Sequence, residues 1–290
     1  MSFMKRLMIM SVLLYFSVMC AVAQTELTIS ECFSKESFTL GSSTLAYRKA
    51  KIGDVSGSHP MLVLYLHGGT SRGSDNEAQL NEKAVGIIYQ YLVSHHLTAV
   101  MLVPQCPSDG GWTNQLRRVV NEMVKLNIAD ENCDADRIYV MGGSMGGTGT
   151  WTQLSYFPNF YAAALPVAGN PTGLDAANVA TTPVLTVMGT ADRIMNISAV
   201  EEFKLQVLDA GGTFILETVA GWTHENTCEQ SYTDTRLDWL FTQTKGQPNR
   251  IVFPFAVEDK DNKIYDLSGR RASGYVHGVY ISHGKKTIVR

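Results

Sequence analysis

A serine lies at the centre of a glycine-rich stretch, residues 142–147. An apolar segment with β-branched and aromatic members, residues 137–141, comes before it, and helix-compatible sequence follows as far as Tyr156. A serine on a strained turn between strand and helix needs glycine beside it, because larger side chains there would clash with the two elements. The turn also places the amide N–H of Met145 at a helix N-terminus, where it can donate to an oxyanion. The pattern predicts that Ser144 is a nucleophile, and the alternative is a glycine-rich turn with an incidental serine.

A nucleophilic serine needs a base that accepts its proton and a third group that orients the base. Among the seven histidines, His224 alone follows a late strand-like segment and precedes a helical one. Asp192 likewise follows an apolar strand-like segment, residues 183–188. The order Ser144, Asp192, His224 is that of the α/β-hydrolases. We therefore predict that these three residues form a catalytic triad. The alternatives are that Asp192 caps a helix and that His224 is an ordinary loop residue.

The oxyanion formed in acyl transfer needs hydrogen-bond donors. A fully apolar segment, residues 61–66, ends in His67 and a Gly-Gly pair. We expect the amide of Gly69, or that of Thr70, to act together with the amide of Met145 as the oxyanion hole.

Two tryptophans, Trp112 and Trp222, lie in loops on the same expected edge of the sheet. We predict that both form walls of the substrate cleft, with plain packing as the alternative for Trp112. The segment 168–182 is short, which indicates an open cleft without a large lid.

Strand-like and helix-like segments alternate between residues 61 and 241, after an expected antiparallel hairpin within residues 38–50. This alternation predicts the α/β-hydrolase fold, a mostly parallel, doubly wound sheet with helices on both faces. The expected helices include residues 77–94, 114–127, 198–209 and 232–241. Short β-like pieces near the end predict a small C-terminal β appendage.

The chain has 290 residues, 45% of them hydrophobic, and a net charge of −3. This length suits one large domain, and the charge gives no sign of a nucleic-acid surface. Metal-ligand spacing and the lysine of a phosphate-binding loop are both missing, so we expect no cofactor and no metal. We predict a signal peptide at 1–23, a catalytic domain at 24–245, a linker at 246–250 and a β-rich tail at 251–290.

The first residues have the pattern of a secretory signal. Lys5 and Arg6 come before an apolar run of about 14 residues, which is short for a membrane span. A small-x-small site ends at Ala23, so we expect export after cleavage there and no stable insertion in a membrane. Lipidation of Cys20 is the alternative.

Cleavage would leave four cysteines, Cys32, Cys106, Cys133 and Cys228. An exported protein can oxidise such residues. Cys106 and Cys228 both lie near the expected active edge, so a bridge between them is one expectation and free buried thiols are the other.

Several motifs resemble those of secreted bacterial α/β-hydrolases identified as predicted peptidases, polyhydroxybutyrate-depolymerase-like esterases or family 1 carbohydrate esterases with feruloyl esterase members. The matching stretches are LYLHGGTSRGSDN (64–76), VPQCP (103–107), DADRIYVMGGSMGGTGTW (134–151), MGTADRIM (188–195) and the region of Trp222 to His224. The resemblance covers roughly residues 60–245 and implies a serine ester hydrolase without a cofactor. The chain departs from the family pattern at Gly69, where alanine is frequent, and at Thr223, where glycine is frequent. The tail is similar to C-terminal segments of exported Bacteroidetes proteins, which in longer forms act as sorting domains.

These observations together predict an exported serine esterase acting on a small-molecule or polysaccharide-linked ester, such as an acetyl or feruloyl group on plant cell-wall carbohydrate. A serine peptidase is the second hypothesis, since the same triad cleaves amides. A catalytically inactive binding protein is the third.

Overall fold

The computed structural model describes residues 28–113 and 115–246, and the backbone of four short strands between residues 264 and 289. The predicted signal peptide and most of the predicted linker lie outside the described residues. No helix in the described part is both long and apolar enough to span a bilayer.

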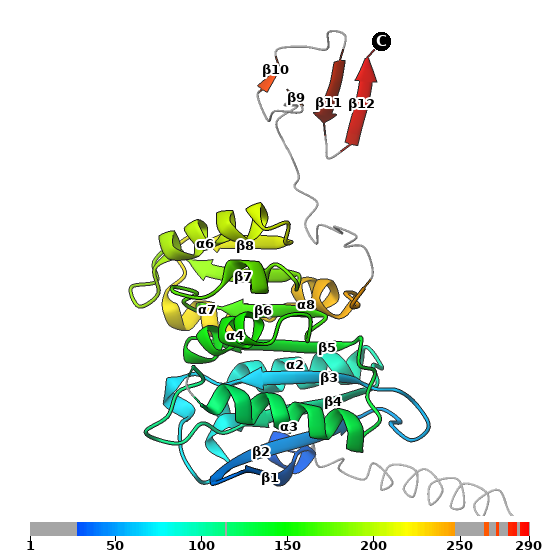
Figure 1. Ribbon diagram of the computed structural model, residues 1–290, viewed down its shortest axis with the longest axis vertical. Coiled ribbons are helices and arrows are strands. Elements are labelled where there is room, and N and C mark those ends of the chain that lie inside the picture. The colour runs from blue at the N-terminus through cyan, green and yellow to red at the C-terminus, as the bar shows by residue number, and fades with distance from the viewer. Residues whose placement is uncertain are drawn as a thin grey trace, which may run out of the picture.

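Eight strands form one sheet in the order β1-β2-β4-β3-β5-β6-β7-β8, which Figure 1 shows from bottom to top. The strands are β1 (Ser34–Leu40), β2 (Ser43–Ile52), β3 (Met61–Leu66), β4 (Ala99–Pro104), β5 (Ile138–Gly143), β6 (Ala163–Val167), β7 (Val184–Gly189) and β8 (Phe214–Val219). β1 and β2 pair as an antiparallel hairpin, and β2 is antiparallel to β4. All other neighbours are parallel.

Helices cover both faces of this sheet (Figure 1). One face carries α3 (Leu116–Asp130), α4 (Met145–Tyr156), α5 (Ala176–Val179) and α6 (Ile197–Asp209). The other carries α2 (Lys83–Ser94), α7 (His224–Gln230) and α8 (Asp234–Phe241). Single turns of 3₁₀ helix are η1 (Ile29–Cys32), η2 (Gly69–Ser71) and η3 (Ala78–Asn81).

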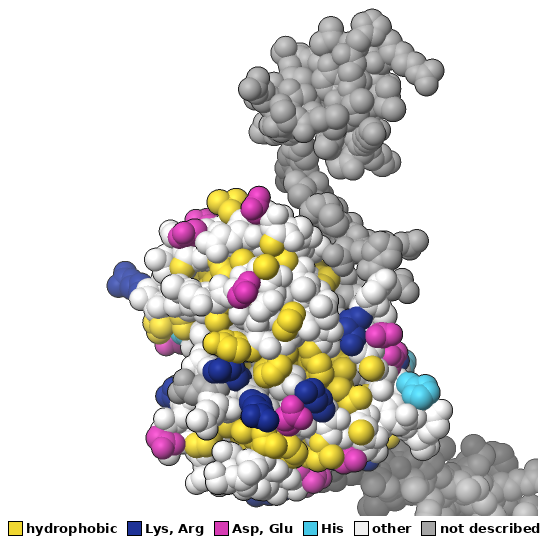
Figure 2. All heavy atoms as spheres, in the orientation of Figure 1, with side chains coloured by type: hydrophobic (Ala, Val, Ile, Leu, Met, Phe, Trp, Pro, Cys, Tyr) yellow, Lys and Arg dark blue, Asp and Glu magenta, His cyan; other side chains and the backbone are white. Residues whose placement is uncertain are grey.

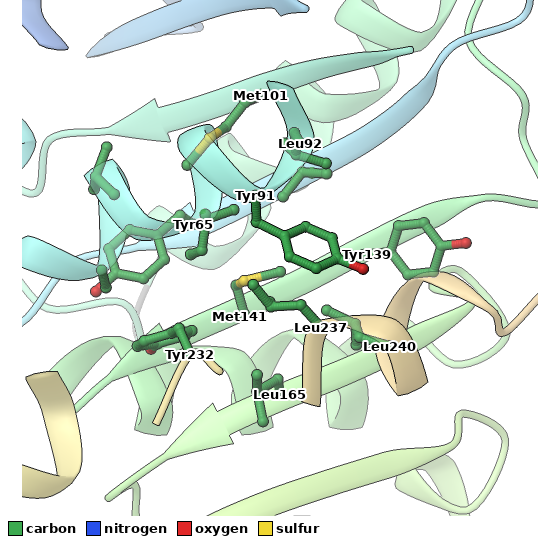
Figure 3. Packing of buried hydrophobic residues seen from close by; sticks show 14 of the residues in the cluster. Tyr65, Tyr91, Leu92, Met101, Tyr139, Met141, Leu165, Tyr232, Leu237 and Leu240 are labelled. Atoms are coloured by element: carbon green, nitrogen blue, oxygen red, sulfur yellow. The ribbon is translucent and has the colours of Figure 1, made fainter. Parts of the chain in front are cut away.

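The apolar runs of the central strands fill two cores, one on each face. On β3, Leu62, Leu64 and Leu66 belong to the core beneath α3, α4 and α6, whereas Val63 and Tyr65 belong to the core beneath α2 and α8. Every β3 residue is buried, because both faces are covered. Each fully buried leucine stabilises the fold by about 1.5–3 kcal/mol. Figure 3 shows the second core, with these side chains of α2, α8 and the strands: Tyr91, Leu92, Leu237, Leu240, Met101, Met141 and Leu165.

Charged side chains of both signs lie on the surface on the side of α3, α4 and α6. Figure 2 shows Lys and Arg side chains intermixed with Asp, Glu and apolar ones on the face in view. The mixture agrees with the small net charge of the chain.

The winding of the sheet reverses between β3 and β5. The chain leaves β3 toward β4 on one side, then returns to pair β5 with the other side of β3. In open α/β sheets, ligands bind where the carboxyl ends of the strands diverge at such a point. Ser144 follows β5 there, and His67 follows β3.

The strands lie within a few residues of the predicted ones, but one predicted helix is wrong in extent and one helix, α7, was not predicted. The single helix expected over residues 77–94 is divided into η3 and α2, because Glu82 takes an extended conformation with φ −70° and ψ 126°. The final helical region has two helices, and the first of them, α7, already begins at His224.

The predicted C-terminal β pieces form a second, antiparallel sheet in the order β10-β9-β11-β12. Its strands are β9 (Ile264–Asp266), β10 (Arg271–Ala272), β11 (Gly278–Ser282) and β12 (Lys285–Val289). The domain boundaries stay a prediction.

Candidate active site

Ser144 lies on the tight turn between β5 and α4. Its backbone has φ 57° and ψ −118°, a conformation that non-glycine residues seldom adopt. The amide of Ser144 donates to the carbonyl of Val167 at 3.0 Å, and its carbonyl accepts from Thr148 at 3.0 Å. These bonds hold the strained turn, which presents the hydroxyl beyond the end of β5.

Position 146, two residues after Ser144, must be glycine because α4 lies close against β3 there. A Cβ atom on Gly146 would lie 1.8 Å from the carbonyl oxygen of Leu66 and 2.9 Å from that of His67. Both atoms belong to backbone, which cannot move aside as a flexible side chain can. The close approach of α4 to β3 therefore depends on glycine at position 146.

We expect Gly146→Ala to lower the free energy of unfolding by about 3 kcal/mol or more, at or above the upper end of the usual cost of overpacking. The measurement is chemical denaturation followed by circular dichroism. Gly86→Ala is the matched control, because Gly86 lies within α2 with open space around it, and alanine there should stabilise the helix by up to about 1 kcal/mol. Equal stability of Gly146→Ala and wild type would contradict the close packing described here.

The structure brings Ser144, His224 and Asp192 together in one chain of hydrogen bonds. Ser144 Oγ lies 2.8 Å from His224 Nε2, and His224 Nδ1 lies 2.8 Å from Asp192 Oδ2. The other oxygen of Asp192, Oδ1, accepts from the amides of Ile194 at 2.8 Å and Met195 at 2.9 Å. The side chain of Asp192 has no exposed surface, whereas that of His224 is 12% exposed. An oriented carboxylate at Nδ1 favours the tautomer in which Nε2 can accept the serine proton.

The loops that carry Asp192 and His224 are fixed to each other. The amide of Ala191 donates to the carbonyl of Trp222 at 3.0 Å, and that of Gly221 donates to Thr190 Oγ1 at 2.9 Å. Thr223, which differs from the glycine of the resembling family, caps α7 by accepting from the amide of Asn226 at 3.3 Å. This cap explains how threonine is accommodated directly before His224.

The two amides predicted as oxyanion donors lie at the starts of helices beside Ser144. Met145 begins α4 and Gly69 begins η2. Within residues 28–113 and 115–246, neither amide has a hydrogen-bond acceptor. The amide of Gly68, by contrast, donates to Glu82 Oε1 at 2.6 Å, so it is already occupied. This arrangement suits the predicted role of Gly69 and Met145, which stays a prediction.

A cavity of about 620 Å³ opens at Ser144 and His224. Its lining includes small, apolar and charged residues: Gly68, Gly69, Thr70, Ala78, Ala84, Gly143, Tyr65, Cys228, Ile194, Glu82, Lys83, Glu225 and Glu229. Ile194 is 68% exposed, so an apolar side chain stands at the mouth of the cavity.

The prediction that Trp112 forms a wall of this cleft is wrong. Trp112 is only 1% exposed, and its indole N–H donates to the carbonyl of His67 at 2.9 Å. A Cβ on Gly149 would lie 2.5 Å from the Cβ of Trp112, so the tryptophan fills a space that this glycine leaves open. Trp112 therefore supports the loop after β3 from within the core. Trp222 is half-buried, lies near the guanidinium of Arg236, and is not among the residues that line the cavity.

Sequence reasoning did not single out several residues that line the cavity, among them Tyr65, Glu82 and Ile194. Ile194 follows Asp192 by two residues, so its position in the Asp loop was an available signal. Tyr65 and Glu82 come from a strand and the start of a helix, where nothing in the sequence sets them apart. Cys228, which was expected near the active edge, lines the cavity.

All four described cysteines are free, so the expected bridge between Cys106 and Cys228 is not formed. Cys228 Sγ lies 3.9 Å from His224 Nε2. Burial is the main cause that raises the pKa of the Cys228 thiol to about 12, so the thiol stays protonated and does not compete with Ser144 as a nucleophile. The described residues hold no group of three or more His, Cys, Asp or Glu suited to a metal ion.

His67 is fully buried in the loop after β3 and is held in its neutral form. Its Nε2 accepts from the amide of Cys106 at 2.9 Å, and its Nδ1 donates to the carbonyl of Gly68 at 2.6 Å. Burial is the main cause that lowers the pKa of His67 to about 4. An added proton would convert the acceptor Nε2 to a donor that faces another donor.

We expect the protein to lose stability between pH 6.5 and about pH 4. In this window the unfolded state binds a proton at His67 and the folded state does not, so the free energy of unfolding falls as pH falls, by up to about 1.4 kcal/mol per pH unit. Urea denaturation at several pH values measures the slope. His67→Gln should reduce it, whereas His59→Gln, on an exposed loop, should not. An unchanged slope in His67→Gln would contradict this assignment.

Comparison with known proteins supports the fold and points to ester chemistry. Residues 108–237 match the family described as "Dienelactone hydrolase family". The bifunctional acetylxylan esterase/xylanase of Neocallimastix patriciarum is 34% identical over 100 residues, which are 34% of this chain and 14% of that protein. The crystal structure of a thermostable esterase is similar with a TM-score of 0.69 and 25% identity, over 75% of this chain and 64% of that one.

A feruloyl esterase module from Clostridium thermocellum, solved with sinapinate, is similar with a TM-score of 0.55 and 15% identity, over 75% of this chain and 90% of that one. Such low identity bears on the fold alone. The sheet order, the helices on both faces and these similarities establish the predicted fold class, the α/β-hydrolase fold.

Proposed function

We propose that this chain of α/β-hydrolase fold is a serine hydrolase of carboxylic esters. The observation that carries the proposal is the continuous chain of hydrogen bonds from Asp192 through His224 to Ser144, beside a cavity and two amides that have no acceptor among the described residues. Acyl transfer by serine requires a nucleophile, a base, a group that orients the base, and donors for the oxyanion. This arrangement supplies a group for each of these roles.

In the proposed reaction, Ser144 Oγ bonds to the acyl carbon while its proton moves to His224 Nε2. The carbonyl oxygen becomes an oxyanion that accepts from the amides of Gly69 and Met145. When the tetrahedral intermediate collapses, the ester C–O bond breaks and the leaving alcohol takes the proton from His224. A water molecule then releases the acyl group from Ser144 by the same steps, again with His224 as base and then acid.

We propose as substrate class an acetyl or feruloyl ester on plant cell-wall carbohydrate. An open cavity suits a substrate that is part of a larger polymer, and the similarity to an acetylxylan esterase is consistent with an ester on such a polymer. Several residues that line the cavity are small and leave room for an acyl group: Gly68, Gly69, Ala78, Ala84 and Gly143. The two tryptophans no longer support this proposal, because neither lines the cavity.

The test is a comparison of rates for p-nitrophenyl acetate, acetylated xylan, methyl ferulate and a peptide p-nitroanilide, with Ser144→Ala as the blank. We expect wild type to turn over the esters and Ser144→Ala to show no such turnover. The ratio of acetate to ferulate turnover then indicates the size of the acyl pocket. Preferred turnover of the anilide would replace the proposal with the peptidase hypothesis. If none of the four substrates is turned over, the proposal of an ester hydrolase is contradicted.

We further propose that the protein is exported after cleavage following Ala23, because of the basic residues, the apolar run and the small-x-small site at the N-terminus. Mass spectrometry of the protein from a secreting host should give a chain that begins at Gln24. An uncleaved chain, or one that begins at a lipidated Cys20, would contradict this.

A further inference from the structure

Glu82 places a carboxylate against the loop that follows β3. Its oxygen Oε1 accepts from the amide of Gly68 at 2.6 Å and from Ser71 Oγ at 2.9 Å, and its Oε2 accepts from Tyr65 Oη at 2.6 Å. The carboxylate thus joins both ends of η2 to a tyrosine of β3. The extended backbone of Glu82, which separates η3 from α2, directs the side chain to this place.

Burial makes the charged form of this carboxylate energetically unfavourable. Burial is the main cause that raises the pKa of Glu82, and the bonds from Tyr65, Gly68 and Ser71 oppose that rise. A charged group at a partly buried position is destabilising unless its partners compensate for lost hydration. Here all three partners belong to the oxyanion loop or to the strand before it, so the carboxylate serves that loop.

The loop that Glu82 holds lies beside Ser144, and both line the cavity. A Cβ on Gly68 would lie 3.3 Å from Glu82 Oε1 and 3.7 Å from the Cβ of Ser144. Because Glu82 occupies the amide of Gly68, the next amide, that of Gly69, is the one left without an acceptor in the described part of the chain. The position of the carboxylate therefore selects which amide is available to the oxyanion.

We propose that Glu82 is a positioning residue of the oxyanion hole, which fixes the Gly68–Ser71 loop so that the Gly69 amide points at the substrate carbonyl. This inference rests on the proposed function. Without the carboxylate, the Gly68 amide and the Ser71 hydroxyl lose their acceptor, and the loop can turn the Gly69 amide away. Loss of one oxyanion donor costs about 10²–10³ in kcat in serine hydrolases.

The experiment compares kcat and KM of wild type, Glu82→Ala, Glu82→Gln and Ser71→Ala for p-nitrophenyl acetate, each corrected for its folded fraction. Glu82→Ala should lower kcat about 100-fold with KM changed less than about threefold, because the oxyanion exists only in the transition state. Glu82→Gln should recover most of kcat, since its amide oxygen can accept from Gly68 and Ser71 while its NH₂ donates to Tyr65 Oη. Ser71→Ala, which leaves Glu82 intact, should lower kcat several-fold, and it serves as the test if Glu82→Ala does not fold.

Glu131→Gln is the matched control. Glu131 is also a shielded, paired carboxylate, with 9% of its side chain exposed and bonds to Lys49 and Lys51, but it lies at the far end of α3 from Ser144. Its loss should lower the unfolding temperature and leave kcat unchanged. Amide hydrogen exchange of residues 67–73 should become faster in Glu82→Ala and stay near wild type in Glu82→Gln and Glu131→Gln.

Two results would overturn the positioning role: a kcat of Glu82→Ala within threefold of wild type, or an equal fall of kcat in Glu82→Gln and Glu82→Ala. If Glu82→Ala does not fold, a kcat of Ser71→Ala equal to that of wild type overturns it. Failure of the proposed function gives a different result, in which Ser144→Ala keeps the turnover of wild type.

Discussion

Ser144→Ala is expected to lower kcat for ester hydrolysis by roughly a millionfold, since loss of the nucleophile of a triad that acts as a unit removes nearly all of its catalysis. His224 and Asp192 would remain in place but would have no hydroxyl to activate. The side chain of Ser144 makes one hydrogen bond within the described chain, to His224 Nε2, so its removal should hardly change stability. The measurement is kcat at saturating p-nitrophenyl acetate, together with the unfolding temperature.

Ser198→Ala, in the first turn of α6, is the control for this substitution and should keep both kcat and stability within small changes. Ester turnover of Ser144→Ala within tenfold of wild type, in a folded protein, would contradict the assignment of the nucleophile.

Asp192→Asn should have the second largest effect, a fall in kcat of roughly ten-thousandfold. The structure fixes which way the new amide would point. The amides of Ile194 and Met195 both donate to the Oδ1 position, so the asparagine oxygen must stay there. Its NH₂ then faces His224 Nδ1, which has to become an acceptor. The ring proton moves to Nε2, and His224 can no longer accept the proton of Ser144.

Nitrogen NMR of the His224 ring measures this change of tautomer independently of the rate. Wild type should carry its proton on Nδ1 and Asp192→Asn on Nε2. A fall in kcat of less than tenfold, or an unchanged tautomer, would show that Asp192 does not have the role proposed here.

The three residues that the structure brings together, Ser144, His224 and Asp192, could be found from the sequence because the proposed chemistry restricts residue type, order and place. A serine between glycines after a β-strand has few structural uses, and only one histidine and one aspartate follow late strands in the required order. The central strands could also be predicted from the sequence, since a parallel sheet covered on both faces needs continuous apolar runs.

The prediction for Trp112 failed because a tryptophan in a loop has the same sequence signature whether it lines a cleft or fills the core. What decides its place is Gly149 on α4, which leaves space for the ring, and that contact is between residues distant in sequence. Glu82 was missed for a similar reason. It lies within an uninterrupted helical pattern, and the break before α2 accompanies its bonds to Gly68 and Ser71.

The central claim is that Ser144 forms a covalent bond with the acyl group of an ester. A fluorophosphonate tests it most directly, because an activated serine attacks the phosphorus, fluoride leaves, and the adduct is stable. Mass spectrometry after trypsin should find one adduct, on Ser144 in the peptide of residues 138–193, formed much more slowly in Asp192→Asn. An adduct on another serine, or ester turnover without any adduct on Ser144, would contradict the account.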